Sequence, residues 1–230
     1  MCGRYALNIT PNQLAQQFQL DEQPEGIKRF NIAPTQPVPV VRVNDTGHRG
    51  LAKLHWGLIP SWAKDPAMGN RMINARSETV TSKPSFRTAF KRRRCLFPAS
   101  GFYEWQKVER PTRKQPTFIR MASDEPFGLA GLWERWQHAN GSELESCTIL
   151  TTHANALMKP IHDRMPVIIQ PAEYQKWLDR DLQDHEALSA LLRPYAADAM
   201  ATHAVSAAVN DPRHEGPDCV QPLPAPRSLF

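Results

Sequence analysis

The sequence predicts a single, strand-rich α+β domain, and three observations support this class. The chain has 230 residues, the size of one large domain. Proline accounts for 21 of them, close to twice the usual frequency of about 5%, and proline shortens helices and avoids central strands. Short apolar runs follow one another without the β-α-β rhythm of a parallel sheet. We therefore expect many short elements, ordered loops and mostly antiparallel strands.

The first predicted element is a helix that begins at Thr10. Thr10 suits the N-cap, Pro11 suits the first helical position, and Gln13 completes a capping box. Leu14 and Phe18 then share one helical face. Strands are predicted, in chain order, at 37–43, 51–59, 95–97, 101–105, 117–121, 127–133, 147–152 and 201–206. Further short helices are predicted at 84–93, 172–178 and 185–192.

No internal repeat or long linker divides the chain, so one domain is expected over residues 2–221. The remaining segment, 222–230, holds three prolines and is predicted to be a flexible tail. Apolar residues make up 41% of the chain and charged residues 22%, which excludes a wholly disordered chain, a coiled coil and a collagen.

Charge and cysteine content restrict the function classes. The net charge of +5 suits an anionic partner such as nucleic acid, although a charge that serves solubility explains it equally well. There is no apolar run of membrane-spanning length and no signal peptide pattern, so a cytoplasmic location without membrane contact is expected. The four cysteines are widely spaced, which predicts neither a zinc site nor disulfides. No glycine-rich nucleotide motif is present, so no cofactor is expected.

Cys2 is the residue with the most informative chemistry. A start methionine before a small residue is normally removed, which would leave Cys2 with a free α-amine beside its thiol. This amine has a pKa of about 7.7–8.0, so it can condense with an aldehyde to a Schiff base, and the thiol can then close a thiazolidine ring. Alternatively, the thiol could attack an amide with the amine as its base, as in N-terminal-nucleophile hydrolases. The third interpretation is an incidental small residue.

Three polar segments carry further candidate groups. Asn74 and Arg76 lie in a polar cluster that fits a phosphate site or, more commonly, the loop at a helix start. Glu104 lies within an aromatic strand, where desolvation would raise its pKa toward the general acid/base range; an edge-strand glutamate facing water is equally consistent. His162 and Arg164 precede a predicted strand, and histidine is the commonest general acid/base, although a lone histidine is more often structural.

Aromatic and basic residues complete the candidate set. Residues 56–62 end a strand in a rigid turn with tryptophan at both ends. Trp62 could stack on a base of single-stranded nucleic acid, at about 1–3 kcal/mol, whereas Trp56 is assigned to the core. The run 91–94 is the strongest local positive charge; a solvated helix end is its simpler explanation, because helix C-termini favour cations.

Six motifs occur in a fixed order along the chain: Cys-Gly-Arg-Tyr at 2–5, Asn-Ile-Ala-Pro-Thr at 31–35, the stretch 56–62, Asn-Ala-Arg-Ser-Glu-Thr at 74–79, Gly-Phe-Tyr-Glu-Trp at 101–105, and His-Asp-Arg-Met-Pro at 162–166. Each is weak alone. Together, over residues 2 to about 210, they resemble the SRAP family of SOS response-associated peptidase proteins. One departure is Ser100, which stands where the family pattern has aspartate and affects a local hydrogen bond rather than the chemistry.

The resemblance implies an α+β domain with a β-barrel-like core that captures abasic sites in single-stranded DNA covalently. By motif, Cys2 would form a thiazolidine with the opened sugar, and Asn74 would orient both. Glu104 would assist ring opening and imine formation, and His162 would handle the sugar hydroxyl during Schiff-base chemistry and its reversal. The residues implied to contact DNA are Arg4, Pro39, Trp62, Arg76, Thr151 and Arg164, with Arg76 as the phosphate clamp.

Three functions therefore compete. The leading hypothesis is a monomeric repair protein that cross-links itself to single-stranded DNA at abasic sites and shields them during replication, in the cytoplasm or, in a bacterium, at the nucleoid. The second is a thiol peptidase that removes its own Met1 or cleaves other chains; it needs an oxyanion hole, which the sequence does not reveal. The third is a non-catalytic reader of nucleic acid, which leaves Cys2 unexplained.

Overall fold

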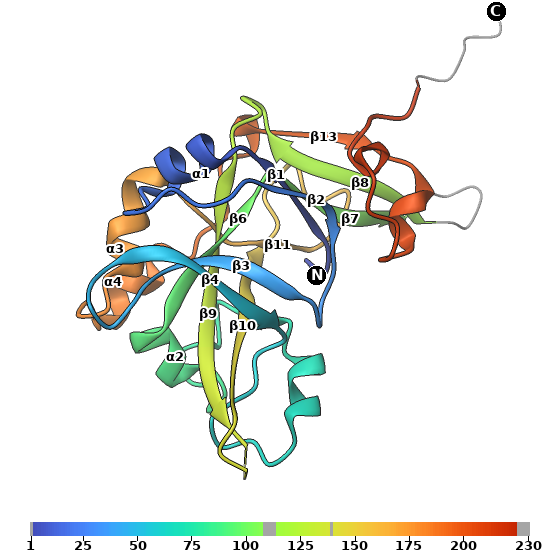
Figure 1. Cartoon of the computed structure of the whole chain (residues 1–230). Coiled ribbons are helices and arrows are strands. Elements are labelled where there is room, and N and C mark those ends of the chain that lie inside the picture. Colours follow the sequence, from blue (N-terminus) through green and yellow to red (C-terminus); the bar gives the residue numbers. More distant parts are fainter. Residues whose placement is uncertain (1, 108–113, 139, 225–230) are drawn as a thin grey trace, which may run out of the picture.

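The centre of the molecule is a closed barrel of five strands (Figure 1). The computed structural model describes residues 2–107, 114–138 and 140–224. The barrel runs β10–β4–β3–β6–β9, and β9 pairs with β10 to close it. Its strands are β3 (Pro37–Val43), β4 (Arg49–Trp56), β6 (Arg94–Ala99), β9 (Phe127–Gln137) and β10 (Glu143–His153). All of these pairings are antiparallel except β4–β10. The predicted α+β domain with a barrel-like, mostly antiparallel core is confirmed.

A second sheet of five strands lies against the barrel in the order β13–β8–β7–β1–β2. Its strands are β1 (Tyr5–Ile9), β2 (Ile27–Ile32), β7 (Gly101–Lys107), β8 (Lys114–Met121) and β13 (Met200–Ala204). The chain passes from β6 in the barrel to β7 in this sheet through Ser100 alone. The Ser100 hydroxyl accepts from the Asn8 amide at 2.8 Å and donates to the Asn8 carbonyl at 3.1 Å. Serine therefore supplies a local hydrogen bond at the position where the family pattern has aspartate.

Short strands extend β10 beyond the end of the barrel. β5 (Asn74–Arg76) runs parallel to β10 on one side, beside residues 149–151. β11 (Arg164–Pro166) pairs antiparallel on the other side, beside residues 151–153, and β12 (Ile168–Ile169) returns to β9. The motifs at 74–79 and 162–166 are therefore brought to the two flanks of one strand.

The α-helices are short, as the proline content predicts. They are α1 (Pro11–Phe18), α2 (Arg87–Arg92), α3 (Tyr174–Leu178) and α4 (His185–Ser189). The capping box of α1 is confirmed, because the Thr10 side chain accepts from the Gln13 amide and the Gln13 side chain accepts from the Thr10 amide. Leu14 and Phe18 are buried, and the Phe18 ring stacks on Tyr174. Short 3-10 helices lie at η1 (Pro66–Arg71), η2 (Pro171–Glu173), η3 (Ala197–Ala199), η4 (Ala207–Asn210) and η5 (Pro217–Cys219).

Some boundaries differ from the predictions. The strand predicted at 51–59 ends at Trp56 because Gly57, at φ 142°, turns the chain out of the sheet. The helix predicted at 84–93 is limited to Arg87–Arg92, since residues 82–86 form turns. The amide of Leu223 donates to the Ala204 carbonyl at 2.9 Å, so the second residue of the predicted tail is still hydrogen-bonded to β13. The rest of that prediction, residues 225–230, lies outside the described residues.

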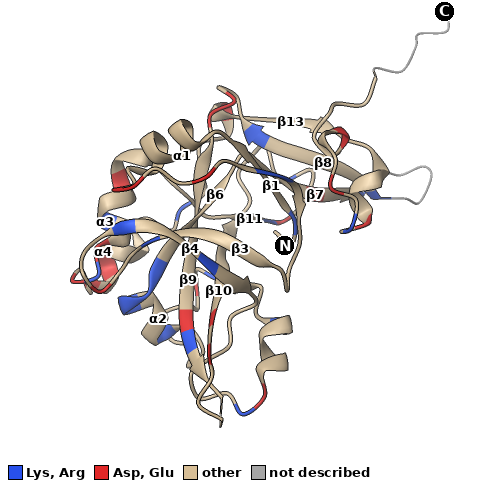
Figure 2. Cartoon of the chain, viewed as in Figure 1, with Lys and Arg blue, Asp and Glu red and all other residues tan. Residues whose placement is uncertain are grey.

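The basic run at 91–94 is only partly a solvated helix end. Figure 2 shows its basic residues on α2 beside the barrel. Arg94 is buried and donates to the carbonyls of Phe90, Lys91, Trp177, Asp179 and Leu182. Burial lowers the pKa of Arg94 to about 10. Arg93 pairs with Glu134 at 2.7 Å, which leaves Lys91 and Arg92 as the exposed cations of the run.

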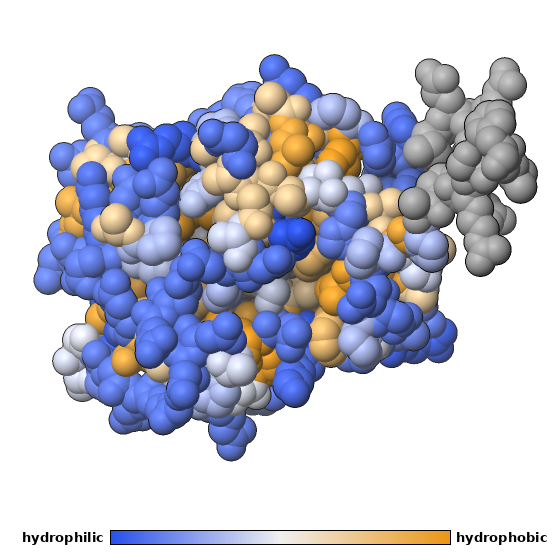
Figure 3. Space-filling view, turned by 90° about the horizontal axis from the view of Figure 1, so that it is seen from above, coloured by the Kyte–Doolittle hydropathy of each residue, from blue (hydrophilic) through white to orange (hydrophobic). Residues whose placement is uncertain are grey.

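The hydrophobic side chains are concentrated inside the molecule. Trp56 is fully buried and donates its indole N–H to the Ile73 carbonyl at 2.9 Å, which confirms its assignment to the core. On the face seen in Figure 3, hydrophilic residues cover most of the surface and hydrophobic ones form small separate areas. Among the described helices, none has both the length and the apolarity to cross a membrane.

Candidate functional site

Cys2 lies where the start of the chain runs between the second sheet and β5. The Arg4 carbonyl accepts from the Tyr103 amide at 2.9 Å, and Tyr5 pairs with Phe102, so the first residues continue the β1–β7 pairing. Cys2 is fully buried. Its carbonyl oxygen accepts a hydrogen bond of 2.9 Å from the Asn74 side-chain amide. The position of Cys2 is therefore set by the β1–β7 pairing on one side and by Asn74 on the other.

Glu104 is the charged group next to this cysteine. It lies on β7, between β1 and β8, and is 3% exposed. The alternative that Glu104 faces water from an edge strand is therefore wrong. Burial raises the pKa of the Cys2 thiol far above its ordinary value, and the negative charge of Glu104 raises it further. The Cys2 thiol is consequently protonated near neutral pH. We call Cys2, Asn74 and Glu104 the Cys2 pocket.

Asn74 and Arg76 lie on β5 rather than in a helix-start loop. Strand alternation puts the two side chains on one face, with the buried Ala75 on the other. Asn74 is half-buried and bonds Cys2, whereas Arg76 is exposed. Within the described part of the chain, Arg76 has no side-chain hydrogen bond or ion pair. Arg76 is thus a cation available to a ligand at the edge of the pocket.

His162 and Arg164 lie on the opposite flank of β10. The Nδ1 atom of His162 lies 2.9 Å from the Arg164 amide nitrogen, which donates to it. The same Nδ1 atom lies 2.8 Å from an Asp163 carboxylate oxygen. Arg164 donates two hydrogen bonds to Glu78, at 2.5 and 3.0 Å, and one to the Thr151 carbonyl at 2.6 Å. Its guanidinium group is already engaged within the protein.

Two residues predicted to contact DNA make hydrogen bonds within the protein. Thr151 is fully buried, and its hydroxyl accepts from Arg164 at 3.3 Å, so Thr151 helps to position Arg164. Arg4 donates to the Asn31 side chain at 2.7 Å and to the Val209 carbonyl at 2.5 Å. Arg4 therefore joins the two ends of the chain and is not a free cation.

The aromatic turn after β4 forms an exposed edge. Trp62 is 55% exposed and lines a hollow of about 640 Å³ with Lys64, Met68, Arg71 and Met72 among its walls. The turn is held because Gly57 and Gly69 pack backbone against backbone, where a Cβ on either would collide with the other. Trp62, Arg76 and Arg164 are called the rim below. Pro39, on β3, is half-buried and pairs with Lys53.

Sequence reasoning missed Glu78, which accepts both hydrogen bonds from Arg164 and lies 3.0 Å from His153. The Arg164 hydrogen bond is the main reason that the pKa of Glu78 is lowered. A signal was present, because Glu78 follows Asn74 and Arg76 at alternate positions of the same motif. Also missed was the packing of residues 205–223 against β1 and β2, for which no local pattern exists.

Comparison with known proteins gives a consistent set of matches. The family described as "SOS response associated peptidase (SRAP)" matches residues 1–212. "Abasic site processing protein YoqW" of Bacillus subtilis is 43% identical over 224 residues, covering 96% of this chain and 99% of the relative. "Abasic site processing protein YedK" of Escherichia coli is 31% identical, covering 97% and 100%. A crystal structure of a Bacteroides thetaiotaomicron protein has a TM-score of 0.86 at 25% identity, covering 96% of this chain and 100% of that one.

Proposed function

Because the chain belongs to the SOS response associated peptidase family, we propose that it processes abasic sites, and that it does so by covalent capture through Cys2 after removal of Met1. The observation that carries this proposal is the Cys2 pocket. It combines the one residue type that can offer an amine and a thiol on adjacent carbons with an amide donor and a buried carboxylate. Relatives of similar length are named as abasic site processing proteins.

The proposed reaction has two steps. The α-amine of Cys2 attacks the C1′ aldehyde of the opened deoxyribose, and loss of water gives the imine. The thiol sulfur then bonds to the imine carbon while its proton passes to the nitrogen, which closes the thiazolidine. Glu104 is suited to carry protons in both steps because it lies within electrostatic range of the thiol. His162 is proposed to act on the sugar hydroxyl during Schiff-base chemistry and its reversal.

The DNA strand is proposed to run over the rim. Arg76 supports this because it is exposed next to Asn74 and can pair with the phosphate beside the lesion. Trp62 offers an exposed face on which a neighbouring base can stack. Pro39 is retained as a weaker candidate for a base contact. Binding as a monomer, in the cytoplasm or at the nucleoid, remains part of the prediction.

The thiol pKa argues against the peptidase alternative. Cysteine nucleophiles of hydrolases are activated by groups that lower the thiol pKa. In the chain that carries Met1, burial and Glu104 raise the pKa of the Cys2 thiol by more than the terminal amine lowers it. An imine, in contrast, is electrophilic enough to be closed by a thiol that gives up its proton during the step. The Cys2 environment therefore favours aldehyde capture over amide hydrolysis.

A denaturing gel tests the proposal. The full-length protein is mixed with single-stranded DNA that carries one abasic site, and mass spectrometry establishes that Met1 is absent. Wild type is expected to give a band that resists heat and detergent. Cys2→Ser keeps the amine without the thiol, so its band should appear only when borohydride reduces the imine.

Two results would overturn the mechanism. A heat-stable band from unreduced Cys2→Ser would mean that the thiol is not part of the link. The absence of any band from wild type with a free Cys2 would reject capture and favour the thiol hydrolase, which a peptide substrate panel would then detect.

A further inference from the structure

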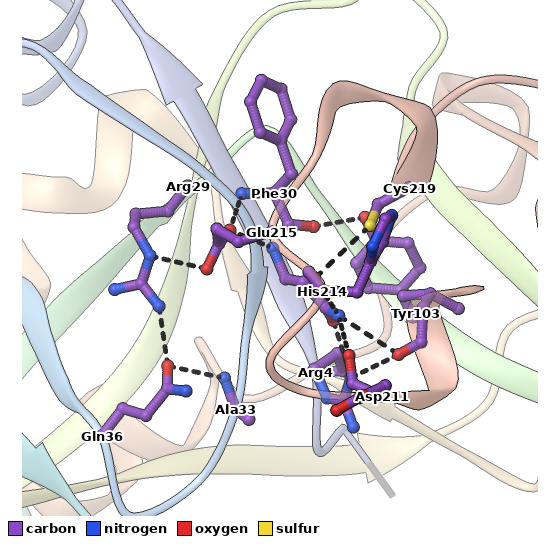
Figure 4. A network of polar contacts seen from close by, with 12 residues as sticks. Arg4, Arg29, Phe30, Ala33, Gln36, Tyr103, Asp211, His214, Glu215 and Cys219 are labelled. Carbon is purple, nitrogen blue, oxygen red and sulfur yellow. Dashed lines mark hydrogen bonds and ion pairs between the residues drawn. The ribbon is translucent and has the colours of Figure 1, made fainter.

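The C-terminal strap, residues 205–223, is fastened to the start of the fold by a polar network (Figure 4). The Asn31 side-chain amide donates to three strap carbonyls, those of Val209, Asp211 and His214, at 3.2, 3.0 and 2.8 Å. The Glu215 carboxylate accepts from the backbone amides of Phe30 and Asn31. The backbone that carries His214 is therefore held in place from the β2 side.

Three side chains of different chemistry converge on this strap. His214 Nε2 lies 2.7 Å from an Asp218 carboxylate oxygen, and the ligand atoms of His214, Asp218 and Cys219 all lie within 4.8 Å of one another. Within the described residues, this is the one group of three histidine, cysteine or acidic side chains so arranged. The Cys219 residue is fully buried, whereas His214 and Asp218 are 40% and 54% exposed, so solvent reaches the cluster from one side.

The geometry is close to that of a tetrahedral metal site. Metal bonds of about 2.0–2.3 Å to nitrogen, oxygen and sulfur place ligand atoms roughly 3.3–3.8 Å apart. The sulfur would move inward by about 1 Å, and the His214–Asp218 pair would open by less. The backbone on both sides is fixed, since the Cys219 amide donates to the Gly216 carbonyl at 3.1 Å and His203 bonds the Val220 carbonyl at 2.8 Å. Binding of a metal ion would therefore cost little conformational entropy in the backbone of this segment.

We propose that His214, Asp218 and Cys219 form a site for a thiophilic divalent cation, of which Zn²⁺ is the representative, with water as the fourth ligand. A mixed nitrogen, oxygen and sulfur donor set favours Zn²⁺ over Mg²⁺ or Ca²⁺, which prefer oxygen. Cys219 loses its proton to the solvent on binding. Asp211 and Glu215 supply negative charge on the strap, while Arg4 and Arg213 are the cations nearby. The wide spacing of the cysteines does not exclude this site, because it uses one cysteine with a histidine and an aspartate.

The site is separate from the Cys2 pocket but is mechanically linked to it. The strap carbonyl of Val209 holds the Arg4 guanidinium, and Arg4 lies two residues after Cys2. A bound cation would fasten the strap between residues 214 and 219, beyond the three carbonyls that Asn31 holds. The role assigned here is structural: the cation stabilises the joint between the two ends of the chain.

Cobalt substitution tests the site. The full-length protein, stripped with a chelator, is titrated with Co²⁺. Wild type is expected to bind one equivalent, with the visible absorption of a tetrahedral ion and a thiolate-to-cobalt charge-transfer band, both removed by excess Zn²⁺. Cys2→Ser should behave as wild type, because its sulfur lies in another pocket.

Variants at the exposed ligands keep the test decisive if Cys219→Ser fails to fold. Asp218→Asn and His214→Gln should fold and should weaken Co²⁺ binding by at least the roughly 10–100-fold that loss of a supporting partner costs at metal sites. Cys219→Ser should lose the charge-transfer band. A wild-type protein without that band, or one whose Co²⁺ titration is unchanged by Asp218→Asn, overturns the proposal and leaves only adventitious surface binding.

Discussion

The Cys2 pocket and the rim differ in how far water reaches their reactive groups. Cys2 and Glu104 are 0% and 3% exposed, whereas Trp62 is 55% exposed and Arg76 lies on the surface. Interactions between charges strengthen away from water, while exposed charges are screened within about 8–10 Å at ordinary salt. The two regions should therefore control different quantities. Pocket residues should set the rate of capture, and rim residues should set the affinity for DNA.

The largest effect is expected for Glu104→Gln in the pocket. Loss of a positioned acid/base should slow cross-linking by about 10²–10⁴-fold, while DNA affinity stays nearly unchanged. Single-turnover rates at saturating DNA, measured across pH 6–8 beside a binding titration, check this. Equal rates and equal pH profiles for wild type and variant would remove Glu104 from the chemistry.

On the rim, Trp62→Ala should weaken binding to single-stranded DNA by about 1–3 kcal/mol, the value of one stacked base. The rate at saturating DNA should not change, because Trp62 does not belong to the pocket. Fluorescence anisotropy gives the affinity, and Trp62→Phe is the matched control that keeps an aromatic face. If the saturated rate falls with the affinity, the division between pocket and rim does not hold.

A smaller effect is expected for Arg76→Ala. Each phosphate contact on a single strand contributes about 0.7 to the slope of log affinity against log salt, so the slope should flatten by that amount. Arg76→Lys keeps the charge and should restore the slope. An unchanged slope in Arg76→Ala would show that this exposed cation touches no phosphate.

The smallest effect is expected for Glu78→Gln. This variant also tests why Arg164, which is paired with Glu78, should contribute less to DNA binding than the exposed Arg76. The Arg164 hydrogen bond lowers the pKa of Glu78, so the pair adds stability above the unfolded carboxyl pKa of about 4.3. That contribution is lost as pH falls through the lowered folded pKa. For a partly exposed pair it amounts to about 0–1 kcal/mol.

Urea denaturation of wild type and Glu78→Gln should therefore differ slightly at neutral pH and converge in acid. Arg164, once released, should strengthen DNA binding, which anisotropy detects. A gap in stability that persists in acid would mean that the variant perturbs packing and not the ion pair.

The fold was predictable where signals are local. The capping box at Thr10 and the proline-bounded strand at 37–43 need only neighbouring residues, and both elements are confirmed. Neither β1 nor β2 was predicted from the sequence. For β2 the reason is its composition: it carries Lys28, Arg29 and Asn31, and so it lacks the apolar alternation of a strand. Its pairing with β1 supplies what its composition does not.

The residues of the candidate site were likewise predictable only where the signal is local. The chemistry of Cys2 could be inferred from its residue type. The burial of Glu104 could not, because only the pairing of β7 with β1 and β8 excludes an edge strand. The state of Arg164 could not, because its partner Glu78 lies 86 positions away and only the pairing around β10 brings them together. Residue type identifies a cation, but tertiary contacts decide whether that cation is available.

The excursion between β4 and β5 has a consequence for engineering. Trp56 pairs with Cys147 and Asn74 with Ile149, so residues 57–73 leave and rejoin β10 only two positions apart, which is about 7 Å. The segment 57–73, which holds the aromatic turn, is therefore an insertion whose two ends are anchored at neighbouring positions of β10. Because closure entropy changes only slowly with loop length, connections of other lengths should be accommodated there without redesign of the barrel.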